Sequence, residues 1–118
     1  MSPTTVSRVA AIDCGTNSIR LLVADLTDGA DGLSLTDVHR EMRVVRLGEG
    51  VDATGRLQPA AIDRTWAALS DYTAILRASG AIRVRMAATS ATRDAANRQD
   101  FVDMVRSTLG REIGRAHV

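Results

Sequence analysis

The residues best suited to binding an anion lie near the start of the chain, between two apolar runs in the segment VAAIDCGTNSIRLLVAD. Thr16, Asn17 and Ser18 offer side-chain donors beside the N–H groups of a turn. Gly15 frees the backbone conformation and lets an oxygen-rich ligand approach closely. Such a turn can surround a terminal phosphate with donors. The sequence therefore predicts a phosphate-binding turn that joins two strands.

Asp13 lies two residues before Gly15, and its carboxylate alone would repel a phosphate. A hard divalent cation such as Mg²⁺ removes the conflict, because it can lie between a carboxylate and a phosphate while keeping several waters. Asp13 therefore predicts a bound metal, with Mg²⁺ as the cofactor. An ordinary hairpin with a polar tip is the alternative, and the motif alone leaves it open.

The residues after the turn exclude two common nucleotide-binding motifs. In a Walker loop or a dinucleotide-binding fold the glycine-rich segment opens a helix, whereas here an apolar run typical of a strand continues to Asp25. A Walker loop also needs a lysine, and all fifteen basic residues of this chain are arginine. Neither motif explains the turn.

The composition limits the class of protein. The chain has 118 residues, of which 45% are hydrophobic, and a formal net charge of +1, as expected for one globular domain. Its single cysteine excludes a disulfide framework and a cysteine-based zinc site. Because aromatic residues are few and charge is dispersed, no nucleic acid partner is expected. The lack of a signal segment or a long apolar run predicts a cytoplasmic protein with no membrane partner.

Strands are expected to hold the turn in place. Two apolar runs, residues 9–12 and 19–25, flank it, and a third segment with mostly alternating character spans residues 33–47, with a bulge near residues 39–41. Residues 48–55 are rich in glycine and predict a loop. Three consecutive strands therefore open the domain.

A long helix is expected over Pro59–Ser79, because proline suits the first helical position and Gly80 suits the end. Its apolar face is expected to contain Ile62, Trp66, Leu69, Thr73 and Leu76. A fourth strand over residues 82–88 and a second helix over Arg98–Leu109, capped by Asn97, complete the chain. The expected order is strand, strand, strand, helix, strand, helix.

A second polar cluster follows the expected fourth strand, in the segment ATSATRDAANRQDF. Thr89, Ser90 and Thr92 carry hydroxyls, and Arg93 can direct two donors at a phosphate. Open α/β sheets bind ligands just beyond the carboxyl ends of their strands. A helix-capping loop with a solvated arginine is the alternative. Two turns suited to phosphate in one small domain favour binding.

Three segments, DCGTNSIRLL, RLGEGVDATGRL and ATSATRDAANRQDF, resemble in this order the amino-terminal domain of the exopolyphosphatase and guanosine pentaphosphate phosphohydrolase family. The resemblance runs over residues 9–109. It implies an α/β domain of the actin-like ATPase (ribonuclease H-like) fold, with a mixed sheet that stops before a fifth strand. It also implies that the full-length protein is a homodimer that uses Mg²⁺ to remove terminal phosphate from inorganic polyphosphate or guanosine pentaphosphate, in a cleft between two such domains.

The resemblance also implies roles for individual residues. Arg46 and Glu49 would lie near the cleft rim, and Arg20 would either point into the site or support it. Cys14 stands where the family has a buried apolar side chain, so we reject it as a nucleophile. Asp13 would lie at the metal. The phosphate-binding residues would be Asp13, Gly15, Thr16, Asn17, Ser18, Ser90 and Arg93.

Two family features are absent from the sequence: a second phosphate turn of the form D-x-G-G-G-S, and a water-activating glutamate after a fifth strand. We therefore assign no catalytic residue within the chain and expect negligible turnover. A missing strand would leave unpaired backbone groups, so weak stability or aggregation is expected as well.

The expected organisation has three parts: a flexible segment over residues 1–8, an incomplete first domain over residues 9–110, and a non-native tail over residues 111–118. The last seven residues match the translation of a common sequencing adapter.

Three other functions stay open. Guanosine pentaphosphate hydrolysis differs only in substrate, a kinase of the same fold superfamily is disfavoured by the ATSATRDAANR segment, and a non-catalytic phosphate-binding module would never act alone.

Overall fold

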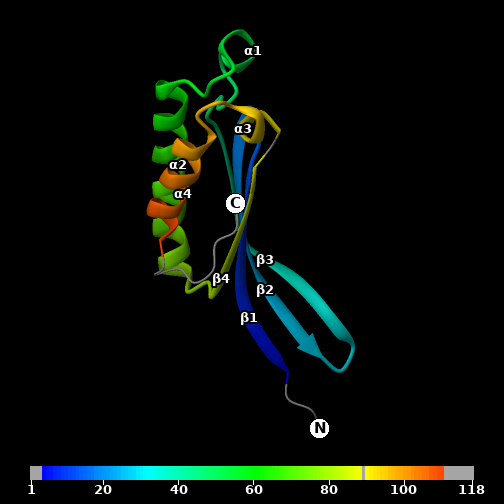
Figure 1. Ribbon diagram of the computed structural model, residues 1–118. Coiled ribbons are helices and arrows are strands. Elements are labelled where there is room, and N and C mark those ends of the chain that lie inside the picture. The colour runs from blue at the N-terminus through cyan, green and yellow to red at the C-terminus, as the bar shows by residue number, and fades with distance from the viewer. Residues whose placement is uncertain (1–3, 89, 111–118) are drawn as a thin grey trace.

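Figure 1 shows a computed structural model of the chain, which describes residues 4–88 and 90–110. Two short helices, α1 and α3, occur in segments that the sequence predicts to be loops. The elements in chain order are β1 (Thr5–Cys14), β2 (Ser18–Gly29), β3 (Gly32–Val44), α1 (Val51–Thr54), α2 (Pro59–Ser79), β4 (Arg83–Ala88), α3 (Ser90–Asp94) and α4 (Arg98–Leu109).

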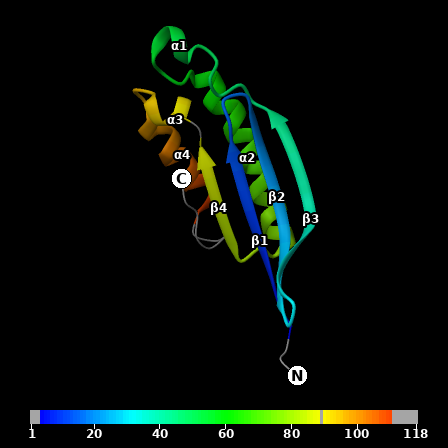
Figure 2. The same ribbon diagram turned by 90° about the vertical axis from the view of Figure 1, so that its right-hand side faces the viewer.

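The described strands form one mixed sheet of four strands in the order β3-β2-β1-β4 (Figure 2). The β1–β2 and β2–β3 pairs are antiparallel, and β4 pairs in parallel with β1. In the parallel register Cys14 lies opposite Ala88, so β1 and β4 end side by side at the same edge of the sheet. The segments that follow these two strands therefore start next to each other.

Helices α2 and α4 cover one face of the sheet, and the described residues leave the other face open (Figures 1 and 2). Alternation along β1 explains this: Ile12 and Cys14 are buried, whereas Ala11 and Asp13 are exposed. Most of the larger side chains of the buried core come from the sheet and from α2 and α4, and two, Leu47 and Leu57, come from the connection between β3 and α2. Those from the two layers are Ile12, Ile19, Leu21, Val23, Leu69, Tyr72, Leu76, Phe101, Val105 and Leu109.

The bounds of α2 and α4 agree with those that the sequence predicts. Pro59 occupies the start of α2, and Gly80 ends it in the left-handed conformation at φ 75°, with its N–H bonded to the carbonyls of Leu76 and Arg77. The expected apolar face is partly wrong, because Trp66 is 52% exposed. Tyr72 is buried instead and donates a 2.8 Å hydrogen bond to the carbonyl of Ile19.

Several strand ends differ from expectation. Residues 5–8, expected to be a flexible segment, belong to β1, where Thr5 pairs with Asp28, and β3 ends at Val44 instead of residue 47. In β3 the register shifts opposite Val23 and Ala24 and leaves Val38 as the extra residue, next to the expected bulge. The tail expected over residues 111–118 lies outside the described residues.

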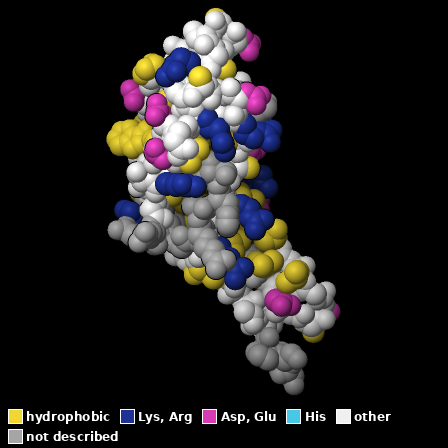
Figure 3. Space-filling model, in the orientation of Figure 1, with side chains coloured by type: hydrophobic (Ala, Val, Ile, Leu, Met, Phe, Trp, Pro, Cys, Tyr) yellow, Lys and Arg dark blue, Asp and Glu magenta, His cyan; other side chains and the backbone are white. Residues whose placement is uncertain are grey.

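The molecule is elongated, with extents of 60 × 24 × 20 Å, because the β2–β3 hairpin projects beyond the helices (Figure 1). The space-filling view shows hydrophobic side chains where the projecting part leaves the rest of the molecule, among polar and charged ones (Figure 3). The exposed large hydrophobic residues of β1 and β3 are spread along these strands and are Val6, Leu33, Leu35, Val38, Met42 and Val44. None of the described helices combines the length and the apolar character needed to cross a membrane.

Candidate phosphate-binding site

The turn between β1 and β2 is closed by its own backbone. The N–H of Gly15 donates a 2.8 Å hydrogen bond to the carbonyl of Ser18. A Cβ atom added at Gly15 would lie 3.3 Å from that oxygen, and the φ angle of Gly15 is not positive. Glycine is therefore favoured here by the close approach of the backbone, and the expectation of a special backbone conformation at Gly15 was wrong. Thr16 and Asn17 are exposed at the tip.

The carbonyl groups of Thr16 and Asn17, in the turn, point toward the loop that follows β3. The Asn17 carbonyl accepts hydrogen bonds from the N–H groups of Val45 and Arg46, and the Thr16 carbonyl accepts one from Gly48, all at 2.9 Å. Anion sites need donors near the ligand and carbonyl oxygens kept away from it. These three bonds engage both carbonyls, so the turn has the polarity that a phosphate requires.

Gly48 leaves the room that this contact needs, although no local pattern in the sequence marks it. A Cβ atom at position 48 would lie 2.3 Å from Cγ2 of Thr16, far inside any normal contact. Arg46 is also unusual: within residues 4–88 and 90–110 it is the one non-glycine residue with positive φ, at 51°. Such strain is typical of segments that other contacts hold in place. The loop after β3 is thus fitted closely to the turn.

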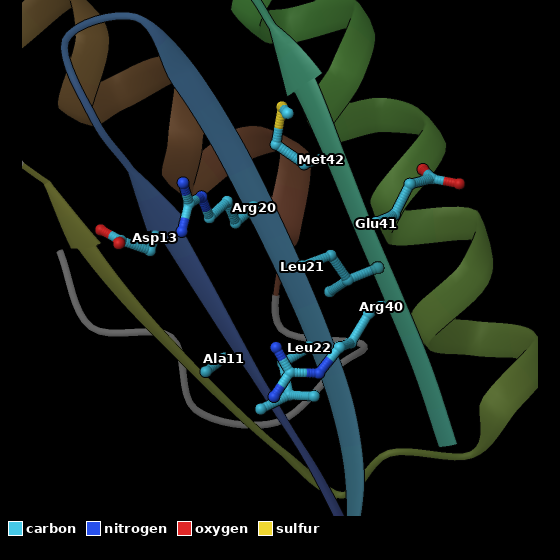
Figure 4. Close-up of a pocket in the computed structure, with 8 residues that line it drawn as sticks. All are labelled: Ala11, Asp13, Arg20, Leu21, Leu22, Arg40, Glu41 and Met42. Carbon is cyan, nitrogen blue, oxygen red and sulfur yellow. The ribbon is translucent and has the colours of Figure 1, made fainter. Parts of the chain in front are cut away.

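Asp13 lies on the open face of the sheet, opposite Arg20 on β2 and Ala87 on β4. It lines a surface hollow of about 510 Å³ together with residues of β2 and β3. Figure 4 shows the Arg20 guanidinium extending from β2 toward β1, on the side where Asp13 lies, while Glu41 points away. Arg20 therefore lies on the same face of the sheet as Asp13.

A metal at Asp13 would have few protein ligands. Among the described residues no group of three or more histidine, cysteine or acidic side chains could hold an ion. Asp13 fits Mg²⁺ in the way that ion often binds to phosphate enzymes, through one or two carboxylates, several waters and oxygens of the substrate. The donor set is therefore compatible with a metal that a phosphate helps to bind.

The second polar segment begins at the neighbouring strand end. Helix α3 follows β4 and lies beyond its carboxyl end, at the end of the sheet where β1 also finishes (Figures 1 and 2). Arg93 is exposed in its last turn. The side chain of Ser90 and all of Thr89 lie outside the described part. The structure thus brings both expected segments to one edge of the sheet.

The connection between β3 and α2 contacts both segments. Near its end, the carbonyl of Gly55 accepts a 2.9 Å bond from the N–H of Ala96. Leu57 pairs with the side chain of Asn97, which accepts from the Leu57 N–H at 2.8 Å and donates to the Leu57 carbonyl at 2.9 Å. Asn97 precedes α4 as expected, but its side chain joins two loops and does not cap the helix.

Cys14 has no role as a nucleophile. Its side chain is fully buried on the helix-covered face. Burial, and to a smaller extent the nearby charge of Asp13, raise the pKa of the thiol to about 12. A buried thiol with this pKa is not ionised near neutral pH, so the rejection of Cys14 is supported by both geometry and charge.

Comparisons with known proteins agree on one family. The sequence profile of the Ppx/GppA phosphatase family matches residues 22–114. Exopolyphosphatase 2 of Mycobacterium tuberculosis is 60% identical over 105 residues, which are 89% of this chain and 33% of that protein. Exopolyphosphatase 1 of the same organism is 30% identical over 106 residues, or 90% of this chain and 30% of that protein.

Solved structures have the same fold. The crystal structure of the Aquifex aeolicus member of the Ppx/GppA protein family matches with a TM-score of 0.81 at 35% identity, covering 95% of this chain and 34% of that one. An exopolyphosphatase from Cytophaga hutchinsonii matches with a TM-score of 0.77 at 29% identity, covering 87% and 32%. The chain spans about a third of the length of these relatives.

Proposed function

Because this chain belongs to the Ppx/GppA phosphatase family, we propose that it is part of an exopolyphosphatase, a hydrolase that removes terminal phosphate from inorganic polyphosphate. The chain supplies one of the phosphate-binding arms of that enzyme. One observation supports this assignment above all others. The two segments richest in phosphate donors follow β1 and β4, which are parallel neighbours and end at the same edge of the sheet.

The proposed roles follow from the chemistry of each group. Thr16, Asn17 and Ser18 provide hydroxyl and amide donors next to the turn, whose carbonyls are engaged elsewhere. Arg93 provides a permanent positive charge with two parallel donors. Phosphoryl transfer depends mainly on positioning and on neutralising the charge of the transferred group. These residues therefore bind and orient the terminal phosphate.

Asp13 is the proposed ligand for Mg²⁺. When bound, the ion supplies positive charge that offsets the negative charge of the phosphate oxygens. Asp13 would hold it from the open face of the sheet, where its carboxylate is exposed. Burial of the neighbouring Cys14 fixes this orientation, because alternate residues of a strand point to opposite faces.

We also propose that the 118-residue chain by itself hydrolyses polyphosphate at a negligible rate. The family resemblance assigns water activation to a glutamate after a fifth strand, and the described residues contain four strands. General-base assistance contributes on the order of a hundred- to ten-thousand-fold to such reactions. Binding without turnover is the expected property of this chain.

Polyphosphate is the preferred substrate in this proposal. Exopolyphosphatase 2 and exopolyphosphatase 1 of Mycobacterium tuberculosis both carry the activity in their names, at 60% and 30% identity. Hydrolysis of guanosine pentaphosphate is the alternative outcome of the assay below. A chain that binds phosphate but takes part in no hydrolysis is the other.

The test is phosphate release from medium-length polyphosphate and from guanosine pentaphosphate, with Mg²⁺. It compares this chain with a form extended by the downstream part of its gene. We expect activity on polyphosphate in the extended form only. In that form Arg93→Ala should lower kcat/KM roughly ten- to hundredfold, the effect of losing a charge-assisted hydrogen bond. Arg106→Ala, which removes an exposed arginine in the last turn of α4, is the matched control. Activity in neither form would refute the proposal.

A further inference from the structure

Arg64, in the second turn of α2, is bound to the loop that touches the phosphate turn. Its Nε donates a 2.8 Å hydrogen bond to the carbonyl of Val45, and its Nη2 donates at 3.3 Å to the carbonyl of Arg46. The same nitrogen lies 3.7 Å from the carboxylate of Glu49. One guanidinium thus contacts three residues of the segment after β3.

The two residues whose carbonyls Arg64 binds also hold the turn. Val45 and Arg46 accept hydrogen bonds from Arg64 through their carbonyls and donate their N–H groups to the carbonyl of Asn17. The next contact, from Gly48 to Thr16, depends on the same loop path. The path from the guanidinium of Arg64 to the turn therefore passes through a single backbone residue, either Val45 or Arg46.

The loop needs such support because its backbone is strained. Arg46 has a φ of 51°, in the left-handed region that costs free energy for a non-glycine residue. A strained conformation persists only when surrounding contacts fix it. The guanidinium of Arg64 and the carbonyl of Asn17 fix the two sides of the Arg46 residue, one at its C=O and the other at its N–H.

We propose that Arg64 is a positioning residue that keeps the Thr16–Asn17 turn in the shape that binds a phosphate. The proposal rests on the proposed function, because the ligand of the turn is the one inferred there. Arg64 touches no substrate; it acts through the loop of residues 45–48. Loss of its guanidinium would let Arg46 relax and would free the carbonyls of the turn to face an anion.

Arg8 provides a matched control at the opposite end of the sheet. Its side chain is 37% exposed, compared with 38% for Arg64. Like Arg64 it donates to a backbone carbonyl, that of Ser79 at 3.0 Å, and contacts a carboxylate, that of Asp25. Both arginines are therefore expected to stabilise the fold, but only Arg64 is connected to the turn.

The experiment compares Arg64→Gln with Arg8→Gln in the full 118-residue chain. Urea unfolding measures stability, calorimetry with Mg²⁺ and tripolyphosphate measures affinity, and amide NMR shifts without ligand report the shape of the turn. Both variants should lose stability. Only Arg64→Gln should shift the amides of Thr16 and Asn17 and weaken tripolyphosphate binding roughly tenfold, the equivalent of one charge-assisted hydrogen bond. Arg64→Lys, which keeps the charge and one donor, should recover part of the affinity.

The outcomes separate this inference from the proposed function. If the unmodified chain binds tripolyphosphate and Arg64→Gln binds it equally well, the positioning role is refuted while the function stands. If the unmodified chain binds no tripolyphosphate but Arg64→Gln shifts the turn amides, the function is refuted while the support of the turn by Arg64 stands. If the amides of Thr16 and Asn17 do not move in Arg64→Gln, the inference is refuted in either case.

Discussion

Replacing Gly48 with alanine should separate the loop after β3 from the phosphate turn. The added Cβ would lie 2.3 Å from Cγ2 of Thr16. Two carbon atoms in ordinary contact are about 3.5–4.0 Å apart, so the loop or the Thr16 side chain must move by more than about 1 Å. The φ of Gly48 is not positive, so the cost comes from the collision and not from the backbone conformation.

The size of the effect follows from two losses. Overpacking of this kind costs about 1–3 kcal/mol, and the hydrogen bond from Gly48 to the Thr16 carbonyl contributes a further net 0.5–1.5 kcal/mol, approximately. We therefore expect Gly48→Ala to lower the free energy of unfolding by roughly 2–4 kcal/mol. Binding of tripolyphosphate should weaken with it, because the Thr16 carbonyl would be released.

A double-mutant cycle isolates the contact. Thr16→Ser removes Cγ2 but keeps the hydroxyl, so in combination with Gly48→Ala it should restore at least about 1 kcal/mol by urea unfolding. Gly29→Ala is the control, because its added Cβ would meet Thr4 Oγ1 at an ordinary 3.7 Å. Strictly additive effects of Gly48→Ala and Thr16→Ser would refute the account of how the loop and the turn fit together.

Three further predictions concern stability and reactivity. Tyr72→Phe removes the buried hydrogen bond to Ile19 and should cost about 1 kcal/mol in thermal unfolding; an unchanged melting temperature would contradict the contact. The Arg8 guanidinium holds the pKa of Asp25 below its usual value, so the pair should stabilise the fold above about pH 4 and lose that effect as the pH falls further. Asp25→Asn should therefore be less stable at neutral pH and less sensitive to acid, whereas equal acid sensitivity would argue against the pairing. Cys14 should react with a thiol reagent only after urea unfolding; rapid labelling of the folded chain would show that it is not buried.

The two long helices, α2 and α4, could be predicted closely because their ends carry local signals. Pro59 and Gly80 mark the two ends of α2, and the short apolar repeat of α4 leaves little freedom in its bounds. The buried face of α2 was less predictable. Spacings of three and four residues fit two neighbouring stripes, and only packing against β2 decides that Tyr72 is buried and Trp66 is exposed.

The turn between β1 and β2 was predictable from residue types, because its small polar residues are adjacent in the sequence. The parts that support it were not. Glycine fits position 48 because a methyl group of Thr16 leaves no room for a side chain, and Arg64 matters because it binds carbonyls of the loop after β3. Both effects depend on contacts between segments that are distant in the sequence. The pairing of Asn97 with Leu57 is of the same kind, since an asparagine before a helix ordinarily indicates a cap. Local sequence patterns contain no information on such contacts.

The central claim is that the turn after β1 and the segment after β4 bind one phosphate group together. The most direct test is an NMR titration of the isotope-labelled chain with pyrophosphate and Mg²⁺, followed at the amides of residues 15–18 and 90–94. The account predicts that both sets of amides shift with the same dissociation constant, and that Arg93→Ala weakens the response of both. Shifts confined to one segment, or two different dissociation constants, would contradict it.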